Sequence, residues 1–276
     1  MIVFLNGKFV PEERAVVSVF DRGFLYGDAM FEGMLINHGE PFRWDEHMKR
    51  LQRGVDFLKL TVPFRYDELL VFARQLIKRN GMREGMLRLS LSRGITGRTY
   101  SPKNAKNPAV IMTVHPLPES SGKNPHWRLV TASLRLPAGD PLAQFKTANK
   151  LPQVLARAEA DAADAQEAIL LNTDGHLVEG TTSNLFWIRN GVVCTPPLPT
   201  SALAGVTRAI VLELCASLKI RTKEVLAGPS ALLKSQGVFL TMTSMGIVET
   251  KSLDGQKLKR SPLVRKLQSA YGRLLA

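Results

Sequence analysis

Lys146 is the first residue of this sequence whose type and setting could support chemistry. It lies in the short polar segment 145–149 (FKTAN), close to the apolar Leu142 and shortly before Pro152, which suits the first turn of a helix. Partial desolvation by apolar neighbours favours the neutral amine, the form that attacks carbonyl groups. Taken alone, the segment is still more typical of a surface lysine. A chemical role for Lys146 therefore depends on support from other features of the sequence.

A second candidate is the carboxylate of Glu179. It ends an apolar run and is followed by Gly180 and by the small polar residues 181–184 (TTSN). We interpret this run as a candidate ligand-binding segment, and an ordinary polar turn is the alternative with equal weight.

An anion site is expected where Gly205 leads into a helix that begins near Val206. The first backbone N–H groups of a helix have no partner within it, and the hydroxyl of Thr207 adds a further donor. A glycine before a helix is common, so this feature also needs support from elsewhere.

A glycine-rich loop with Arg93, Arg98 and Tyr100 follows the strand expected over residues 86–92. The planar fork of arginine suits bidentate binding of a carboxylate. Arg98 is the better candidate, because Arg93 lies directly at the strand end, where a structural ion pair is expected. Taken alone, the loop favours a solvated turn with surface ion pairs.

His47 and Arg50 are three residues apart, which places them on one face of the helix expected over residues 43–58. Taken alone, this pair favours an exposed polar face.

The elements that must position these residues mix strands and helices without a regular βαβ rhythm. Hairpins are expected at Asn6-Gly7, Asp174-Gly175 and Asn190-Gly191. Apolar residues recur at helical spacing over 43–58, where Asp45 is placed to cap the helix, and over 67–79, 152–165 and from 206 onward. This mixture predicts two α+β domains, and the polar stretch 119–125 puts the boundary near residue 120.

The composition is that of an ordinary globular protein, with 276 residues of which 45% are hydrophobic and 22% charged. The first residues lack the order of a secretory signal, and no apolar run reaches the roughly 18 residues of a membrane span. We therefore expect a cytoplasmic protein without a membrane partner. The net charge of +13 is dispersed, which favours a basic surface with sites for small anions over a nucleic-acid partner.

Together these features resemble one family, the class IV (fold-type IV) pyridoxal-phosphate (PLP) aminotransferases. This family includes branched-chain and D-amino-acid aminotransferases and 4-amino-4-deoxychorismate lyase. The resemblance covers nearly the whole chain, and it is carried in order by residues 21–28 (DRGFLYGD), 31–32 (FE), 47–51 (HMKRL), 146–149 (KTAN), 179–180 (EG), 183–186 (SNLF) and 205–208 (GVTR).

The resemblance implies a two-domain fold of mixed α/β (α+β) type with the cofactor at the domain interface. The smaller N-terminal domain would comprise residues 1–120, and the larger PLP-binding domain residues 121–276. It also implies a homodimer in which a loop of one subunit completes the site of the other.

The resemblance further implies a role for each matching residue. Lys146 would carry PLP as a Schiff base and move the catalytic proton, and Glu179 would pair with the pyridine nitrogen. The remaining cofactor-binding residues would be Arg50, supported by His47, with the N–H groups of Val206 and Thr207, and Thr243. Phe31, Arg98 and Tyr100 would contact the substrate, and no metal is expected.

Two segments depart from the aminotransferase pattern. Branched-chain enzymes carry a tyrosine where this chain has Lys150, and aminotransferases typically carry Thr-x-x-Glu around residue 242, where this chain has residues 241–247 (TMTSMGI). The second segment, like the loop around Arg98, resembles the lyase, whereas residues 31–33 (FEG) resemble the aminotransferases. The roles of Lys150 and Met245 stay open.

We therefore expect a transaminase that moves an amino group between an amino acid, or an amine, and a 2-oxo acid. The alternative is the lyase, which would release pyruvate and 4-aminobenzoate. A non-catalytic basic binding protein is a remote third hypothesis, against which the intact Lys146 and Glu179 argue.

Overall fold

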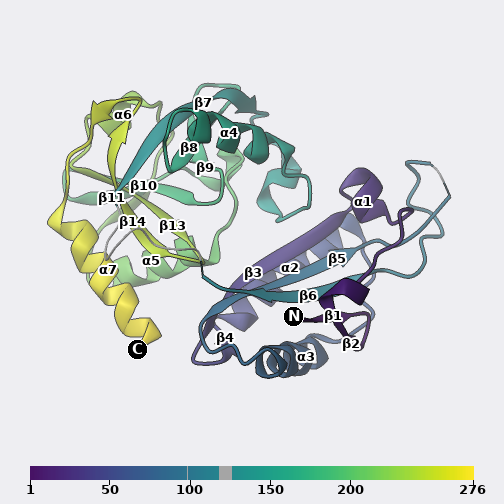
Figure 1. The fold of residues 1–276 in the computed structure, drawn as a ribbon. Coiled ribbons are helices and arrows are strands. Elements are labelled where there is room, and N and C mark those ends of the chain that lie inside the picture. Colours follow the sequence, from purple (N-terminus) through teal and green to yellow (C-terminus); the bar gives the residue numbers. More distant parts are fainter. Residues whose placement is uncertain (98, 118–125) are drawn as a thin grey trace. The chain divides into compact units, whose positions relative to one another are not determined.

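The computed structural model describes residues 1–97, 99–117 and 126–276, and the chain forms two compact units (Figure 1). Unit 1 comprises Met1–Pro118 together with Phe145–Asn149, and unit 2 comprises Glu119–Gln144 together with Lys150–Ala276. The predicted boundary near residue 120 lies outside the described residues. The segment that carries Lys146, which the sequence-based division grouped with the C-terminal residues, belongs to unit 1.

Unit 1 is an antiparallel sheet with two helices packed on it. The sheet order is β2-β1-β6-β5-β3-β4, and the helices α2 (Trp44–Leu58) and α3 (Tyr66–Arg79) bury their apolar stripes against β1, β3 and β6. The short helix α1 (Arg22–Tyr26) precedes β3, the longest strand of this sheet. The strands are β1 (Ile2–Leu5), β2 (Lys8–Pro11), β3 (Ala29–Asn37), β4 (Glu40–Pro41), β5 (Gly85–Ser92) and β6 (Val110–His115).

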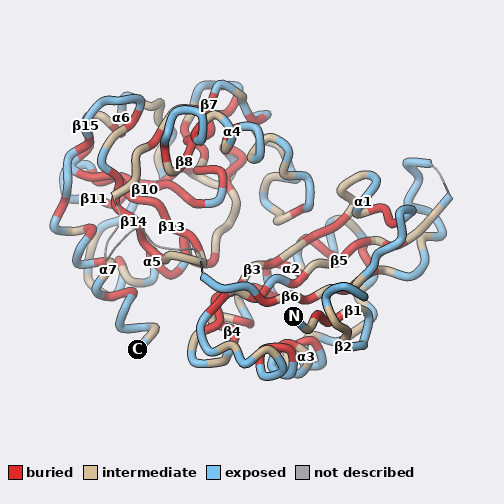
Figure 2. Tube along the Cα trace, in the orientation of Figure 1, coloured by how far each residue is buried: buried red, intermediate tan, exposed pale blue. Residues whose placement is uncertain are grey.

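The buried positions of unit 1 follow the two periods expected from the sequence (Figure 2). Leu87, Leu89 and Leu91 of β5 are all buried in one core with the helix residue Leu51, which confirms the predicted alternation. The predicted cap is wrong. The residue before α2 is Arg43 in the left-handed region (φ 57°) and no side chain caps the helix, so Asp45 lies within the first turn, where its charge favours the helix dipole.

Unit 2 contains a sheet that closes on itself. The path runs β12-β11-β10-β13-β14-β7-β8-β9, and β9 also pairs with β10 through Glu179 and Asn184, so that β10, β13, β14, β7, β8 and β9 form a ring. The predicted hairpins β8–β9 and β10–β11 are confirmed. The strands are β7 (Trp127–Leu136), β8 (Glu167–Asn172), β9 (Leu177–Gly180), β10 (Asn184–Arg189), β11 (Val192–Thr195), β12 (Thr222–Glu224), β13 (Gly237–Met242), β14 (Gly246–Leu253) and β15 (Gln256–Lys257).

The helices of unit 2 are α4 (Leu151–Ala162), α5 (Val206–Ser217), α6 (Ser230–Leu233) and α7 (Pro262–Leu275). Helix α4 packs on β7 and β8 and ends three residues earlier than predicted, while α5 contacts α7. Both units thus combine strands and helices, as predicted. Within the described ranges, no helix is both long and apolar enough to cross a membrane.

Candidate active site

Lys146 lies beside β3 in unit 1. Its backbone carbonyl accepts a hydrogen bond from the N–H of Phe31 (2.9 Å), and the neighbouring Thr147 forms a bridge with Met30. The half-buried Lys146 side chain places Nζ 4.7 Å from the centroid of the Phe31 ring. The structure therefore brings together two residues that the sequence analysis took from separate motifs.

Arg88 also contacts Phe31, and the sequence analysis did not consider it as a candidate functional residue. The carbon of its guanidinium lies 3.9 Å from the centroid of the Phe31 ring, and burial lowers the pKa of Arg88. Arg88 alternates along β5 with the buried Leu87 and Leu89, which places it on the polar face of that strand. The alternation in the sequence could have identified it, because it leaves an arginine opposite the core face.

His47 and Arg50 on α2 both bind the carboxylate of Glu32 on β3. Arg50 donates from Nε (2.8 Å) and Nη2 (2.5 Å), and His47 Nδ1 lies 2.7 Å from Glu32 Oε2. All three side chains are buried, with Glu32 0%, His47 1% and Arg50 4% exposed, so the exposed polar face that the pair alone favours is wrong. The reason is Glu32, a strand residue whose position opposite the helix no spacing within α2 could show.

The charges in this cluster set the pKa values of Glu32 and His47. Burial alone would raise the pKa of Glu32, but the charge of Arg50 and the hydrogen bonds from Arg50 and His47 outweigh it and lower the pKa to about 2. Burial, together with the charges of Arg50 and Lys146, lowers the pKa of His47 and outweighs the hydrogen bond and charge of Glu32, which raise it. Near neutral pH the carboxylate is therefore ionised and the imidazole neutral. The ring proton is then on Nδ1, which donates a hydrogen bond to Glu32.

Glu179 is held at the pair that closes the ring of strands in unit 2. Its Oε2 accepts hydrogen bonds from Asn184 Nδ2 (3.1 Å) and from the backbone N–H of Leu203 (2.9 Å). Asn184 Nδ2 also donates to the carbonyl of Leu203 (2.8 Å). Only glycine fits at position 205, because a Cβ there would lie 1.9 Å from Asn184 Oδ1. The carboxylate is thus fixed in orientation next to the start of α5.

Another buried carboxylate, Glu167, explains the polar run after Glu179. Glu167 Oε1 accepts from the hydroxyl and the backbone N–H (3.0 Å) of Thr181, and Oε2 accepts from Thr182 Oγ1 (3.1 Å) and Ser183 Oγ (3.0 Å). Three of the four residues interpreted as a candidate ligand-binding segment therefore bind a side chain of the protein itself. Glu167 was missed, because a glutamate at the start of an apolar strand gives no sign of its partners.

The other predicted cofactor residues of unit 2 lie at a helix start and in a turn. Val206 and Thr207 are the first two residues of α5 and are buried. Thr243 is half-buried in the turn between β13 and β14. In the same turn Gly246 has a φ of 66°, and a Cβ on it would lie 2.6 Å from the ring of Tyr271. Met245 packs against the core of unit 2.

The predicted substrate loop follows β5 in unit 1. Tyr100 is 85% exposed, and Arg98 lies outside the described residues. Arg93 forms an ion pair with Asp28 (Nε to Oδ2, 2.7 Å), which confirms the structural role expected for it.

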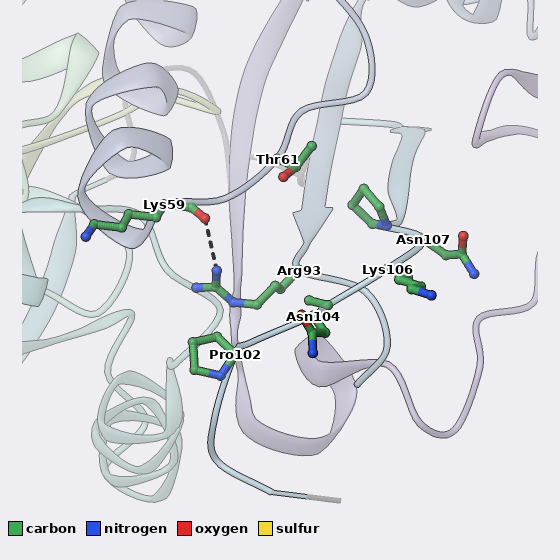
Figure 3. Close-up of a pocket in the computed structure, with 9 residues that line it drawn as sticks. Lys59, Thr61, Arg93, Pro102, Asn104, Lys106 and Asn107 are labelled. Carbon is green, nitrogen blue, oxygen red and sulfur yellow. Dashed lines mark hydrogen bonds between the residues drawn. The ribbon is translucent and has the colours of Figure 1, made fainter. Parts of the chain in front are cut away.

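A cavity of about 470 Å³ opens beside Arg93 in unit 1 (Figure 3). None of the described residues predicted to bind cofactor or substrate lines it, so we do not assign it to the site. Its lining consists of Lys59, Thr61, Arg93, Pro102 and residues 104–108.

The chain resembles known proteins in both sequence and fold. The model of the amino-transferase class IV family matches residues 29–253. The chain is 30% identical over 275 residues to a D-alanine aminotransferase of Bacillus licheniformis, which covers 98% of this chain and 95% of the relative. It is 30% identical over 250 residues to an aminodeoxychorismate lyase of Bacillus subtilis, covering 90% and 85%. The crystal structure of the branched-chain amino acid aminotransferase of Escherichia coli superposes with a TM-score of 0.93 at 28% identity, covering 100% of this chain and 94% of that one.

Proposed function

The chain belongs to the class IV aminotransferase family, and from this membership we propose that it is a PLP-dependent enzyme that moves an amino group between an amino acid, or an amine, and a 2-oxo acid. The observation that carries the proposal is Glu179. Two donors fix its carboxylate at the start of α5, in a chain that also presents Lys146 beside β3.

The donor groups fit PLP by their chemistry. A phosphate needs N–H and hydroxyl donors, which the start of α5 and Thr207 offer, and a pyridine nitrogen needs an anion, which Glu179 offers. In addition, Thr241 Oγ1 is buried without a hydrogen-bond partner among the described residues, one residue before Met242 at the end of β13. The proposal has one cofactor bound by Lys146 and Arg50 of unit 1 and by Glu179, Val206, Thr207 and Thr243 of unit 2.

The residues of the chain would divide the work. When bound, PLP supplies an electron sink next to the amino group of the substrate. Lys146 Nζ would hold the cofactor and then accept and return a proton. Glu179 would keep its own charge facing the ring nitrogen, because Asn184 and Leu203 prevent its carboxylate from turning away. Arg50 would offer its guanidinium to the phosphate in the orientation that Glu32 fixes.

The lyase is the second candidate function, and one feature of the structure favours it. Aminotransferases typically carry Thr-x-x-Glu around residue 242, whereas this chain has Gly246 there, at a position where the left-handed backbone and the ring of Tyr271 leave room for glycine alone. The sequence of this turn and the relative from Bacillus subtilis point in the same direction.

One experiment separates these candidates and tests the cofactor. Borohydride reduction of the purified enzyme should fix PLP to the peptide that contains Lys146, as found by mass spectrometry. The reduced and unreduced enzymes are then assayed with D- and L-amino acids, amines and aminodeoxychorismate. Keto-acid formation supports the transaminase, and 4-aminobenzoate supports the lyase. A protein that binds no PLP and turns over none of these compounds contradicts the proposal.

We further propose a homodimer, supported by exposed apolar side chains in both units. In unit 1, Val16 is 74% and Phe24 75% exposed, and in unit 2 the α4 residues Leu151 and Val154 are 67% and 60% exposed. Leu151 and Val154 are three residues apart and share one face of α4, and an exposed apolar face is typical of a surface that is covered by a partner. Light scattering should give twice the mass of the chain, and a fully active monomer would contradict this assembly. The cytoplasmic location stays a prediction.

A further inference from the structure

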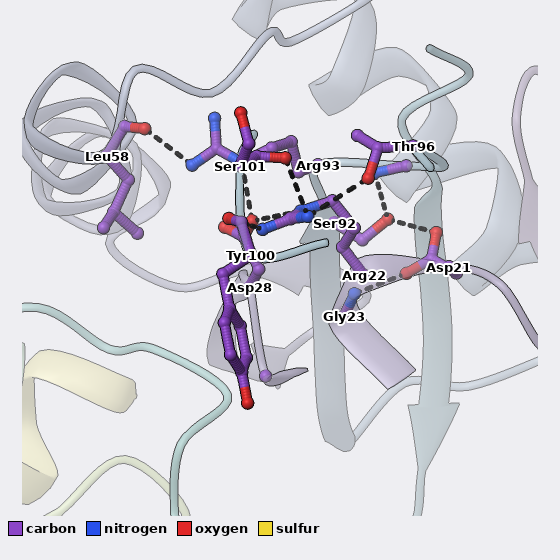
Figure 4. A network of polar contacts seen from close by, with 12 residues as sticks. Asp21, Arg22, Gly23, Asp28, Leu58, Ser92, Arg93, Thr96, Tyr100 and Ser101 are labelled. Carbon is purple, nitrogen blue, oxygen red and sulfur yellow. Dashed lines mark hydrogen bonds and ion pairs between the residues drawn. The ribbon is translucent and has the colours of Figure 1, made fainter. Parts of the chain in front are cut away.

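One arginine holds the backbone of the loop that follows β5. Arg22, the first residue of α1, is 4% exposed. Its Nη1 donates to the carbonyls of Thr99 (2.9 Å) and Ser101 (3.2 Å), and its Nη2 donates to the carbonyl of Tyr100 (2.9 Å) (Figure 4). Three consecutive carbonyls of the loop therefore point at one guanidinium.

The base of the loop is bound to the same residue. Arg22 Nη1 also donates to Thr96 Oγ1 (3.1 Å), and the backbone N–H of Arg22 donates to the carbonyl of Gly94 (2.8 Å). Gly94 has a φ of 88°, and a Cβ on it would lie 2.2 Å from the carbonyl oxygen of Lys106. The loop is thus fixed at its start and again at residues 99–101.

Arg22 is itself fixed through Asp28. Asp28 Oδ2 accepts from Arg22 Nε (2.8 Å) and from Arg93 Nε (2.7 Å). Arg93 in turn donates to the carbonyls of Leu58 (2.8 Å) and Lys59 (3.0 Å) at the end of α2. A continuous set of charge-assisted hydrogen bonds therefore connects the loop to the helix that carries His47 and Arg50.

The loop presents one exposed aromatic residue from this fixed backbone. Tyr100 is 85% exposed, and its ring centroid lies 5.3 Å from that of Tyr26. The guanidinium of Arg22 lies 5.0 Å from the same Tyr26 ring. The backbone is held at its carbonyls and the ring contacts Tyr26 at the end of α1, so the exposed side chain can offer its hydroxyl to a ligand.

We propose that Arg22 is a positioning residue, which holds Thr96 and residues 99–101 in the conformation that presents Tyr100 to the carboxylate of the substrate. This inference rests on the proposed function and on the substrate contact that the family resemblance implies for Tyr100. Arg22 would set KM for amino acids without contacting them. Lysine cannot replace it, because a single ammonium cannot reach four loop acceptors and Asp28 from the fixed positions of a planar fork.

The test uses the PLP-bound enzyme carrying Arg22→Lys. We expect KM for the best amino-acid substrate to rise about five- to fiftyfold, with kcat changed less than about threefold and PLP affinity retained. A direct readout of the loop accompanies the kinetics. Limited trypsin digestion should cleave after Lys103 several times faster than in the wild type, as followed by mass spectrometry.

The matched control is Arg74→Lys. Arg74 is also an arginine of unit 1 in an ion pair, with Glu40 at 2.7 Å, but it is exposed. Its replacement should change neither KM nor the rate of cleavage. If Arg22→Lys does not fold, Thr96→Val removes one loop acceptor and should raise KM about two- to threefold and accelerate cleavage.

Two results overturn the inference. One is an Arg22→Lys enzyme with unchanged KM and unchanged cleavage, and the other is a loss of kcat and PLP affinity without a change in KM. A failure of the proposed function is seen separately, because the wild type would then use no amino acid before Arg22 is altered.

Discussion

Glu32 in unit 1 and Glu167 in unit 2 are both fully buried carboxylates, and the protein stabilises them in different ways. Glu32 binds the cation Arg50 with both oxygens and also accepts from His47. Glu167 accepts from hydroxyl and backbone N–H groups of one turn and, within the described residues, forms no ion pair.

The difference shows what each carboxylate fixes. The partners of Glu32 lie on another element, so this carboxylate fixes a buried cation against the sheet. Removing either charge would leave the other buried without a counter-charge and would strongly destabilise the fold. Apart from the N–H of Ala168 next to it, the partners of Glu167 are the three residues between β9 and β10, so this carboxylate fixes a turn and with it the spacing of Glu179 and Asn184. Unit 1 thus contains a cation of fixed orientation, Arg50, and unit 2 contains a carboxylate of fixed orientation, Glu179.

The largest expected effect comes from removing the amine that unit 1 supplies. Lys146→Ala should abolish covalent attachment of PLP and lower turnover by at least about a thousandfold, because in the proposed function one group both holds the cofactor and moves the proton. Absorbance spectra, borohydride trapping and initial rates measure this. Lys78→Ala, which changes an exposed lysine of the same unit, is the control and should change none of them. Wild-type rates in Lys146→Ala would refute the assignment of chemistry to unit 1.

Glu32→Gln tests the charge pair of unit 1. It keeps the shape of the side chain but leaves Arg50 buried without its counter-charge, so the free energy of unfolding should fall by about 3–5 kcal/mol. Urea unfolding followed by tryptophan fluorescence measures the loss. Glu40→Gln removes an exposed partner of Arg74 in the same unit and should cost less than about 1 kcal/mol. Equal losses in the two variants would show that burial does not distinguish the pairs.

Glu167→Gln should have a smaller effect than Glu32→Gln. The amide oxygen can still accept one set of donors, and the amide nitrogen can donate to hydroxyl oxygens, so we expect a loss of about 1–3 kcal/mol. Because the turn borders Glu179 and Asn184, PLP affinity should fall as well. The control is Glu159→Gln, in which a partly exposed carboxylate accepts from Ser133 N and Oγ (2.7 Å each). Full PLP affinity in Glu167→Gln would contradict the role of this turn.

The same contrast explains what the sequence could predict. Local periods predicted α2, α3 and the alternating strand β5, and turn dipeptides predicted the hairpins, because these depend on neighbours in the chain. The family resemblance named Lys146, Glu179 and Arg50. The partners of the two buried carboxylates could not be predicted, because Glu32 and Arg50 meet only when α2 packs on β3. The three backbone carbonyls that bind Arg22 leave no trace in the side-chain pattern of the loop.

The dependence of stability on pH offers the finest test of the charge pair. Burial lowers the pKa of His47 below its ordinary value of 6.5. Below that pH the unfolded chain therefore binds a proton at His47 more readily than the folded protein does. Stability should therefore fall as the pH drops below about 6.5, by at most about 1.4 kcal/mol per pH unit for this one group.

A second fall should begin at lower pH, and it belongs to Glu32. Its pKa of about 2 lies below the ordinary 4.5, so its contribution to stability is present above pH 4.5 and is lost as the pH falls toward 2, about 3 kcal/mol in all.

Urea unfolding between pH 8 and pH 5 isolates the first fall in stability, which belongs to His47. His47→Gln should remove it while keeping a donor to Glu32, whereas His38→Gln, at an exposed histidine of the same unit, should leave it in place. An unchanged slope in His47→Gln would mean that folding does not alter proton binding at His47, which would contradict the lowered pKa of this imidazole.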